Sequence, residues 1–173
     1  KKSKIKDIYI STDSKKIMEF GLSHGIEVPF LRPSSISDDK SKMEDVIKHF
    51  CDVVGKKKAF KNVILLQPTS PLRSFEDINA AIDLFLSSNS DSLVSAYNSS
   101  ELKELKKIMK VNNNYIEKFC EIDKRDFIIR NGPSILITKL DNIISNNLYG
   151  KKIVPFMMKK SSSIDIDTLD KMI

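Results

Sequence analysis

The chain has 173 residues, of which 40% are hydrophobic and 30% carry a charge, with a formal net charge of +6. This length and balance are typical of one globular domain with a real core. No apolar run approaches the roughly 20 residues of a membrane span and no signal peptide is visible. Cys51 and Cys120 are isolated, so neither a zinc site nor redox chemistry is indicated. We interpret them as reduced thiols of a cytoplasmic protein that does not contact the membrane.

The positive charge could indicate a nucleic-acid partner. The basic residues are 25 scattered lysines and only four arginines, and the chain has no Trp and no interleaving of aromatic with basic residues. A solvated basic surface is therefore favoured over nucleic-acid binding. The few arginines are more informative, because a planar guanidinium suits carboxylate and phosphate recognition.

Hydrophobic periodicity predicts strands that alternate with helices. The first is a strand over 5–10, followed by a helix that Asp13 or Ser14 caps and Gly25 ends. The next helix begins with a Ser41–Glu44 capping box and ends at Gly55, and a buried strand over 63–66 follows it. A helix capped by Ser74 and Asp77 and a strand over 92–97 come next. The alternation predicts an α/β, Rossmann-like fold with a mostly parallel sheet and helices on both faces.

The pattern changes between residues 99 and 130, where segments 108–111 and 115–119 flank three asparagines and predict a hairpin. We interpret 99–130 as an insertion that covers the site or pairs with another subunit. A strand over 134–138, a short helix over 140–145 and strands over 154–157 and 164–166 complete the prediction. No second domain is visible, so residues 1–173 are predicted to form one domain.

Residues 163–168, Ser-Ile-Asp-Ile-Asp-Thr, place Asp165 and Asp167 two positions apart. In a strand both carboxylates would project from one face while Ile164 and Ile166 pack behind them. Adjacent carboxylates repel each other, and a hard cation such as Mg²⁺ is the usual way to hold them together. An exposed edge strand with solvated acids is the alternative.

Three polar loops follow predicted strands, at residues 11–13, at 67–73 and from Ser95 onward. Ligands of open α/β sheets bind beyond the carboxyl ends of strands. The second loop is stiffened by two prolines and precedes a helix, which suits an anionic or polyhydroxylated ligand. A plain strand-to-helix connection is the alternative. Arg32, held by Pro33, could reach a phosphate or a base edge, or form a surface salt bridge.

Five segments now appear in order and at suitable spacing: Ser-Thr-Asp at 11–13, Val-Pro-Phe-Leu-Arg-Pro at 28–33, Leu-Leu-Gln-Pro-Thr-Ser-Pro-Leu-Arg at 65–73, Asn-Gly at 131–132 and the 163–168 segment. Together they resemble the acylneuraminate cytidylyltransferases, or CMP-sialic acid synthetases, which have the nucleotide-diphospho-sugar transferase type of fold. The resemblance covers essentially the whole chain, and segments 65–73 and 163–168 are its specific part.

The resemblance implies that a nine-carbon 2-keto sugar acid attacks the α-phosphate of CTP, giving CMP-sugar and pyrophosphate for surface glycan synthesis. Asp165 and Asp167 would hold Mg²⁺ against the phosphates and act in catalysis. The implied nucleotide-binding residues are Ser11, Asp13 and Arg32. The implied sugar-binding residues are Gln67, Thr69, Ser70, Arg73, Lys106, Arg130 and Asn131. The 99–130 insertion would be the dimerisation element of a homodimer.

The sequence departs from the family pattern in two places. The family begins with a strand and a Gly-rich basic loop that cradles CTP, and nothing here matches it, so we expect an N-terminally truncated domain. The usual Arg-x-Asn-Gly-Ala-Ile-Tyr becomes Arg-Asn-Gly-Pro-Ser-Ile-Leu at 130–136, which suggests a legionaminic- or pseudaminic-type sugar. The alternatives are a CTP:3-deoxy-octulosonate cytidylyltransferase and a non-catalytic remnant of the family.

Overall fold

The computed structural model of the chain describes residues 3–97, 108–112, 114–117, 127–130 and 134–166, and for 108–112, 117 and 127–130 it describes the backbone alone. The helices are α1 (Lys15–Ser23), α2 (Met43–Val54), α3 (Phe75–Ser87) and α4 (Leu140–Ile144). The strands are β1 (Asn62–Leu65), β2 (Ser92–Tyr97), β3 (Ile108–Asn112), β4 (Tyr115–Glu117), β5 (Phe127–Arg130), β6 (Leu136–Lys139) and β7 (Ile153–Met157). No helix in these ranges is long and apolar enough to cross a membrane.

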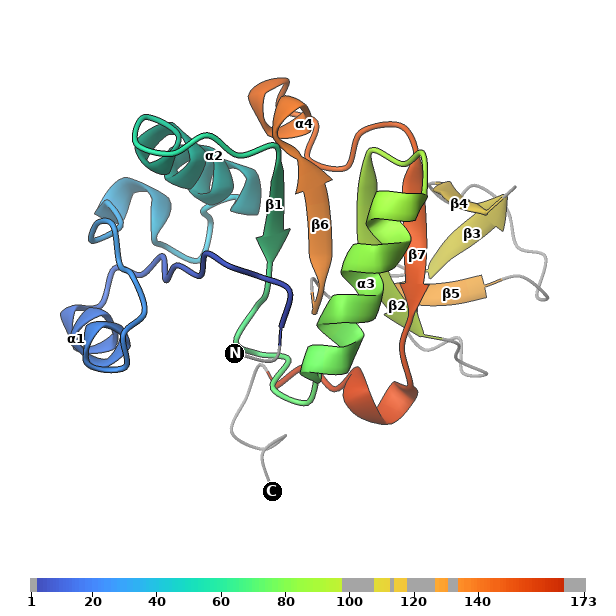
Figure 1. Ribbon diagram of the computed structural model, residues 1–173, viewed down its shortest axis with the longest axis horizontal. Helices are drawn as coiled ribbons and strands as arrows, with labels where there is room; N and C mark the ends of the chain where they lie inside the picture. Colours follow the sequence, from blue (N-terminus) through green and yellow to red (C-terminus); the bar gives the residue numbers. More distant parts are fainter. Residues whose placement is uncertain (1–2, 98–107, 113, 118–126, 131–133, 167–173) are drawn as a thin grey trace.

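The strands form one seven-stranded sheet in the order β1-β6-β2-β5-β3-β4, with β7 paired to β2 (Figure 1). The α/β class is confirmed, but the sheet is mixed rather than mostly parallel. β6 runs antiparallel to both β1 and β2, and only the β2–β7 pair among the described strand pairs is parallel. The reversal arises because strands β3 to β5, rather than a crossover helix, lie between β2 and β6 in the sequence.

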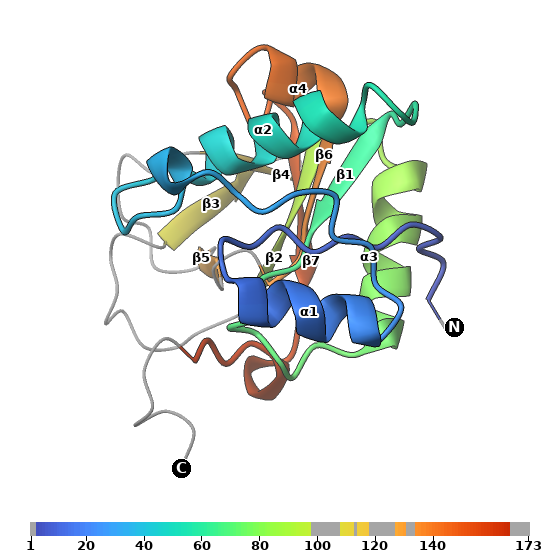
Figure 2. The same cartoon turned by 90° about the vertical axis from the view of Figure 1, so that its left-hand side faces the viewer.

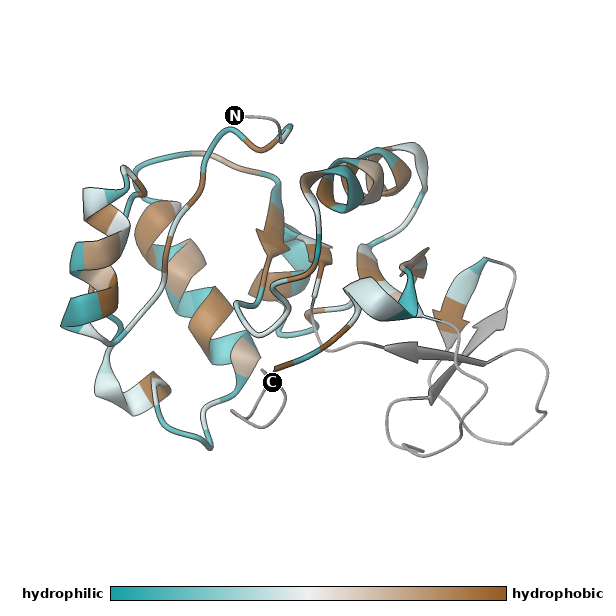
Figure 3. Ribbon diagram, turned by 90° about the horizontal axis from the view of Figure 1, so that it is seen from below, coloured by the Kyte–Doolittle hydropathy of each residue, from teal (hydrophilic) through white to brown (hydrophobic). Residues whose placement is uncertain are grey.

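Because β6 is inverted between them, β1 and β2 still run in the same direction, and β7 runs with them. Their carboxyl ends therefore meet at one edge of the sheet, at the bottom of Figure 1. The loop after β1 and the segment after β7 both lie there, and Figure 3 views this edge from below. Of the predicted sugar and metal residues, those of the 67–73 loop and Asp165 lie at this edge.

Helices cover both faces of the sheet, as predicted. α2 and α4 lie on one face and α3 on the other (Figure 2). Ile47 of α2 and Ile143 of α4 pack with Val94, whereas Phe85 of α3 packs with Leu93. The neighbours Leu93 and Val94 are 0% and 2% exposed. Strand periodicity alone sends these two adjacent side chains into opposite layers.

The helix ends follow local chemistry closely, with one exception. Ser14 caps α1, Gly25 follows it at a φ of +72°, and Ser74 with Asp77 forms the complete capping box of α3. The predicted Ser41–Glu44 capping box is wrong. The Ser41 hydroxyl instead donates to Asp38, 2.7 Å away, and α2 begins at Met43 without a side-chain cap.

Three other strand predictions have distinct outcomes. Residues 5–10 form no ladder; two isolated parallel bridges, Tyr9–Glu27 and Thr12–Leu31, connect the segments on either side of α1. The hairpin is confirmed as β3 and β4, with Asn114 at a φ of +68°. The predicted strand over 164–166 is wrong, because these residues have no strand pairing and Ile164 is 43% exposed rather than packed behind the acids.

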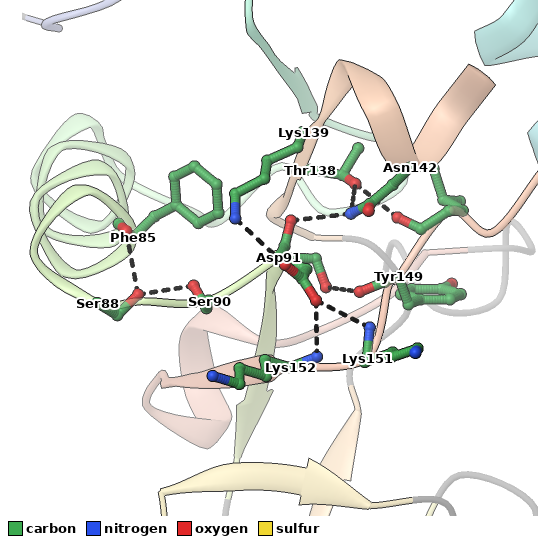
Figure 4. Close-up of polar contacts among 12 residues, drawn as sticks. Phe85, Ser88, Ser90, Asp91, Thr138, Lys139, Asn142, Tyr149, Lys151 and Lys152 are labelled. Carbon is green, nitrogen blue, oxygen red and sulfur yellow. Dashed lines mark hydrogen bonds and ion pairs between the residues drawn. The ribbon is translucent and has the colours of Figure 1, made fainter. Parts of the chain in front are cut away.

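Asp91 holds together the opposite edge of the sheet, where β2 and β7 begin and β6 ends (Figure 4). One carboxylate oxygen accepts hydrogen bonds from the backbone N–H groups of Lys151 (3.0 Å) and Lys152 (3.1 Å). The other oxygen lies 3.2 Å from the Nζ atom of Lys139. These N–H donors lower the pKa of Asp91 below its ordinary value of 3.8. The polar groups around Asp91 therefore have partners and stabilise the fold.

Candidate active site

The first group of candidate residues lies at the N-terminal end of α1. The backbone N–H of Arg32 donates to the Thr12 carbonyl at 2.7 Å, which joins the two segments that flank α1. The Arg32 Nη2 atom lies 3.2 Å from the Asp13 carboxylate, and Nε donates to the Ser37 hydroxyl at 3.0 Å. The Arg32 side chain is only 21% exposed. The Arg32 guanidinium is therefore half-buried and fixed by Asp13 and Ser37, and its ion pair is not a mobile surface contact.

Ser11 belongs to the same group. Its hydroxyl oxygen is buried and has no hydrogen-bond partner within the described part of the chain. The next residue, Thr12, differs because its hydroxyl accepts from the backbone N–H of Ser14 at 3.1 Å and so shapes the turn into α1. Ser11 thus presents a polar atom that the described part of the fold leaves without a partner.

The second group is the loop after β1 together with the segment after β7. The loop is a tight turn, in which the Ser70 N–H donates to the Gln67 carbonyl at 3.3 Å. The backbone N–H of Ile166 donates to the Thr69 carbonyl at 2.8 Å. This bond brings Asp165 beside the loop, although the two lie almost a hundred residues apart in sequence. Ser70 is 2% exposed, so the turn is built into the molecule.

Two side-chain oxygens of this group are buried and lack hydrogen-bond partners among the described residues: Oγ1 of Thr69 and Oδ1 of Asp165. A buried polar atom that makes no hydrogen bond costs about 1–3 kcal/mol. A carboxylate oxygen is the type of ligand that Mg²⁺ prefers. Asp165 therefore fits the predicted metal ligand in chemistry, and Thr69 fits a residue that hydrogen-bonds a polar substrate.

The Arg73 side chain hydrogen-bonds to its own loop, whereas the sequence predicted a contact with the sugar. Its Nη1 atom donates to the main-chain carbonyls of Gln67 and Ser70, the latter at 2.9 Å. Burial lowers the pKa of the guanidinium. The side chain thus faces the inside of its own loop.

Several candidates cannot be placed in the site. Lys106, Asn131 and Asp167 lie outside the described residues. Arg130 is described by its backbone alone, which pairs with Ala96 of β2 at the end of β5. Within the described part of the chain no three His, Cys, Asp or Glu residues gather as a metal cluster. The Mg²⁺ assignment of Asp165 with Asp167 remains a prediction.

The structure adds Ser134, which sequence reasoning missed. β1 and β6 pair up to Leu65 and Leu136, so Gln67 and Ser134 both lie two residues beyond the last pair, at the same edge. Ser134 is fully buried and its hydroxyl has no partner among the described residues. A serine at the start of an apolar strand was the only signal, and it is too common to be specific.

Comparison with known proteins bears on the family. A family model described as cytidylyltransferase matches residues 1–166. The chain belongs to the cytidylyltransferase family. It is 32% identical to the CMP-N,N'-diacetyllegionaminic acid synthase of Legionella pneumophila, over 94% of this chain and 73% of that protein. It is 28% identical to an N-acylneuraminate cytidylyltransferase of Streptococcus agalactiae, over 97% of this chain and 41% of that protein. These relatives confirm the acylneuraminate type that the motifs predicted.

Solved structures confirm the fold. A CMP:2-keto-3-deoxy-manno-octonic acid synthetase in complex with CTP matches with a TM-score of 0.66 at 11% identity, over 89% of this chain and 73% of that one. A 4-diphosphocytidyl-2C-methyl-D-erythritol synthase from Anaerococcus prevotii matches with a TM-score of 0.61 at 12% identity, over 97% and 78%. Both neighbours share the α/β architecture of this chain.

Proposed function

We propose that this cytidylyltransferase transfers CMP from CTP to a nine-carbon 2-keto sugar acid of the legionaminic, sialic or pseudaminic type. The anomeric oxygen of the sugar would bond to the α-phosphorus, the bond from that phosphorus to the β-phosphate oxygen would break, and pyrophosphate would leave. The hydroxyl proton passes to solvent. The relative that makes CMP-N,N'-diacetyllegionaminic acid, at 32% identity, supports this substrate class.

One observation of the structure carries the proposal: Oδ1 of Asp165 is buried without a hydrogen-bond partner among the described residues, and Asp165 lies beside the loop that presents Gln67 and Thr69. We assign Asp165, together with Asp167, to Mg²⁺. When bound, the ion would supply positive charge that offsets the charge developing on the α-phosphate. The sugar would be oriented by Gln67 and by the Thr69 hydroxyl.

The group around α1 would bind the nucleotide. Arg32 is held in place by Asp13 and Ser37, so its guanidinium is pre-positioned and loses little conformational entropy on binding an anion. Ser11 would supply a hydrogen bond to the nucleotide. A guanidinium that is already held in place before the nucleotide binds can contribute more affinity per hydrogen bond.

The test is pyrophosphate release from CTP and Mg²⁺ by the protein as its own gene encodes it. The acceptors are N,N'-diacetyllegionaminic, N-acetylneuraminic and pseudaminic acids, with 3-deoxy-manno-octulosonic acid as competitor. We expect turnover with at least one nine-carbon acid. Turnover with the eight-carbon acid alone would favour the alternative enzyme, and turnover with none would overturn the proposal.

A matched pair of variants tests the metal assignment. Asp165→Asn should lower kcat by roughly 10²-fold or more, because a neutral amide oxygen is a much weaker Mg²⁺ ligand than a carboxylate. Asp83→Asn is the control, since Asp83 forms an exposed ion pair with Lys4, with side chains 60% and 52% exposed. It should leave kcat unchanged. Equal kcat values for the two variants would contradict the role of Asp165.

We also propose that the protein works in the cytoplasm as a homodimer joined through residues 99–130, and that its CMP-sugar is used for surface glycans. Light scattering of the purified protein tests the dimer. Asp165 lies outside that segment, so Asp165→Asn should keep the oligomeric state of the wild type.

A further inference from the structure

The guanidinium of Arg73 hydrogen-bonds to the main chain of its own loop. Nη1 donates to the carbonyls of Gln67 and Ser70, which lie three residues apart at the two ends of the turn. Hydrogen bonds from a charged donor are about twice as strong as neutral ones. The same guanidinium is partly desolvated, so these two bonds face little competition from water. The two carbonyls are thereby directed toward the inside of the loop.

The Thr69 carbonyl lies between these two in sequence and bonds to a different segment of the chain. It accepts the N–H of Ile166 at 2.8 Å, and Ile166 follows Asp165 directly. Residues 67–70 are closed as a turn by the Ser70 N–H to Gln67 carbonyl bond. With the carbonyls on either side held by Arg73, the peptide plane that carries the Thr69 carbonyl has little freedom to rotate.

We propose that Arg73 is a positioning residue: it fixes the turn at 67–70 so that the Thr69 carbonyl anchors Ile166 and thereby places the Asp165 carboxylate. This differs from a direct contact between Arg73 and the sugar. Its catalytic consequence rests on the proposed function, because only there does Asp165 hold Mg²⁺. The anchoring itself is a property of the folded chain and can be measured without substrate.

The first experiment is hydrogen exchange of the Ile166 amide, followed by NMR. Arg73→Met removes the donors and should speed Ile166 exchange at least tenfold. Arg73→Lys keeps the positive charge but loses the planar guanidinium, and should speed Ile166 exchange about threefold. Ser74→Ala is the matched control: it removes the cap of α3, one residue away, without touching the loop carbonyls. It should leave Ile166 exchange within twofold of the wild type.

Wild-type exchange at Ile166 in Arg73→Met would overturn the proposal. Should that variant not fold, Arg73→Lys decides, and wild-type exchange there would overturn it equally. Faster Ile166 exchange in Ser74→Ala, matching that in Arg73→Met, would mean general destabilisation and would also overturn it.

Kinetics separate positioning from substrate contact. In Arg73→Met the Mg²⁺ concentration for half-maximal rate should rise about tenfold, with partial recovery in Arg73→Lys, while KM for CTP stays within twofold. A rise in KM for the sugar acid alone would show that Arg73 binds the sugar and contradict the proposal. If the wild type turns over no sugar acid, the proposed function fails, and the exchange data still decide the role of Arg73.

Discussion

Replacing Asp91 with asparagine removes one negative charge from the edge of the sheet opposite the candidate site. The main-chain bonds of residue 91 remain, including its N–H to the Lys152 carbonyl at 2.7 Å. What is lost is the anionic acceptor for two backbone N–H groups and for the Lys139 ammonium. Asparagine has the same shape as aspartate but offers only one acceptor oxygen. Its NH₂ group would place two N–H donors against the N–H and ammonium donors that now surround the carboxylate.

The magnitude follows from these contacts. A hydrogen bond to a charged group contributes about 1.5–3 kcal/mol, and asparagine retains one of the acceptor interactions in neutral form. The Lys139 pair has side chains 40% and 29% exposed and adds at most about 1 kcal/mol. We therefore expect Asp91→Asn to lower the free energy of unfolding by about 2 kcal/mol, which for a chain of this length lowers Tm by about 4–8 °C.

The pH dependence identifies the cause. The pKa of Asp91 is lowered in the folded state from its ordinary value of 3.8, so its stabilisation is present above that value and is lost as the pH falls through the folded-state pKa. The difference between wild type and Asp91→Asn, measured by urea unfolding, should be constant from pH 7 to about pH 5 and should shrink below 3.8.

The exposed acid Asp83 gives the control. Asp83→Asn should change the free energy of unfolding by no more than about 0.5 kcal/mol at any of these pH values. A loss in Asp91→Asn that persists unchanged at pH 3 would refute the reasoning, because it would then come from packing rather than from the carboxylate charge.

Three further variants or reagents test other features. Thr69→Val removes a partnerless hydroxyl, so Tm should stay within about 2 °C while KM for the sugar acid rises about tenfold, since such a hydrogen bond contributes about 1–1.5 kcal/mol. Gly150→Ala should lower the free energy of unfolding by about 2–4 kcal/mol, because the residue has a φ of +67° and a new Cβ would lie 2.4 Å from the Asp91 Cβ. Burial raises the pKa of the Cys51 thiol to about 11, so iodoacetamide should label Cys51 at neutral pH only after unfolding.

The features that the sequence predicted well are those decided within a few residues. The capping box of Ser74 and Asp77 spans three residues, and its geometry needs nothing from the rest of the chain. The Ser41 prediction failed for an equally local reason: the Ser41 hydroxyl accepts from the Asp38 N–H at 3.1 Å and donates to the Asp38 carboxylate, which a capping pattern alone does not reveal.

Long-range features were harder to predict because they depend on partners far away in sequence. Alternating acids and isoleucines at 163–168 are compatible with a strand, but a strand also needs a neighbouring edge, and the Ile166 N–H instead meets the Thr69 carbonyl. The inversion of β6 likewise depends on how the chain crosses from β2, which periodicity does not encode. The family could be predicted because its motif residues are recognisable in type, whereas the contacts that join the segments could not.

Polar groups that build the fold and polar groups left for a ligand can be distinguished by whether they are satisfied. Around Asp91 the buried polar atoms have partners, as native proteins require. The described residues contain five buried side-chain atoms without one: those of Ser11, His49, Thr69, Ser134 and Asp165. Three are predicted site residues, Ser134 shares the edge of the loop, and His49 packs against Phe30, two residues before Arg32. At about 1–3 kcal/mol each, unmade hydrogen bonds are costly unless something else forms them. Under the proposed function, the nucleotide would offer partners to the α1 group, and the sugar acid and Mg²⁺ would do so for the 67–70 turn and Asp165.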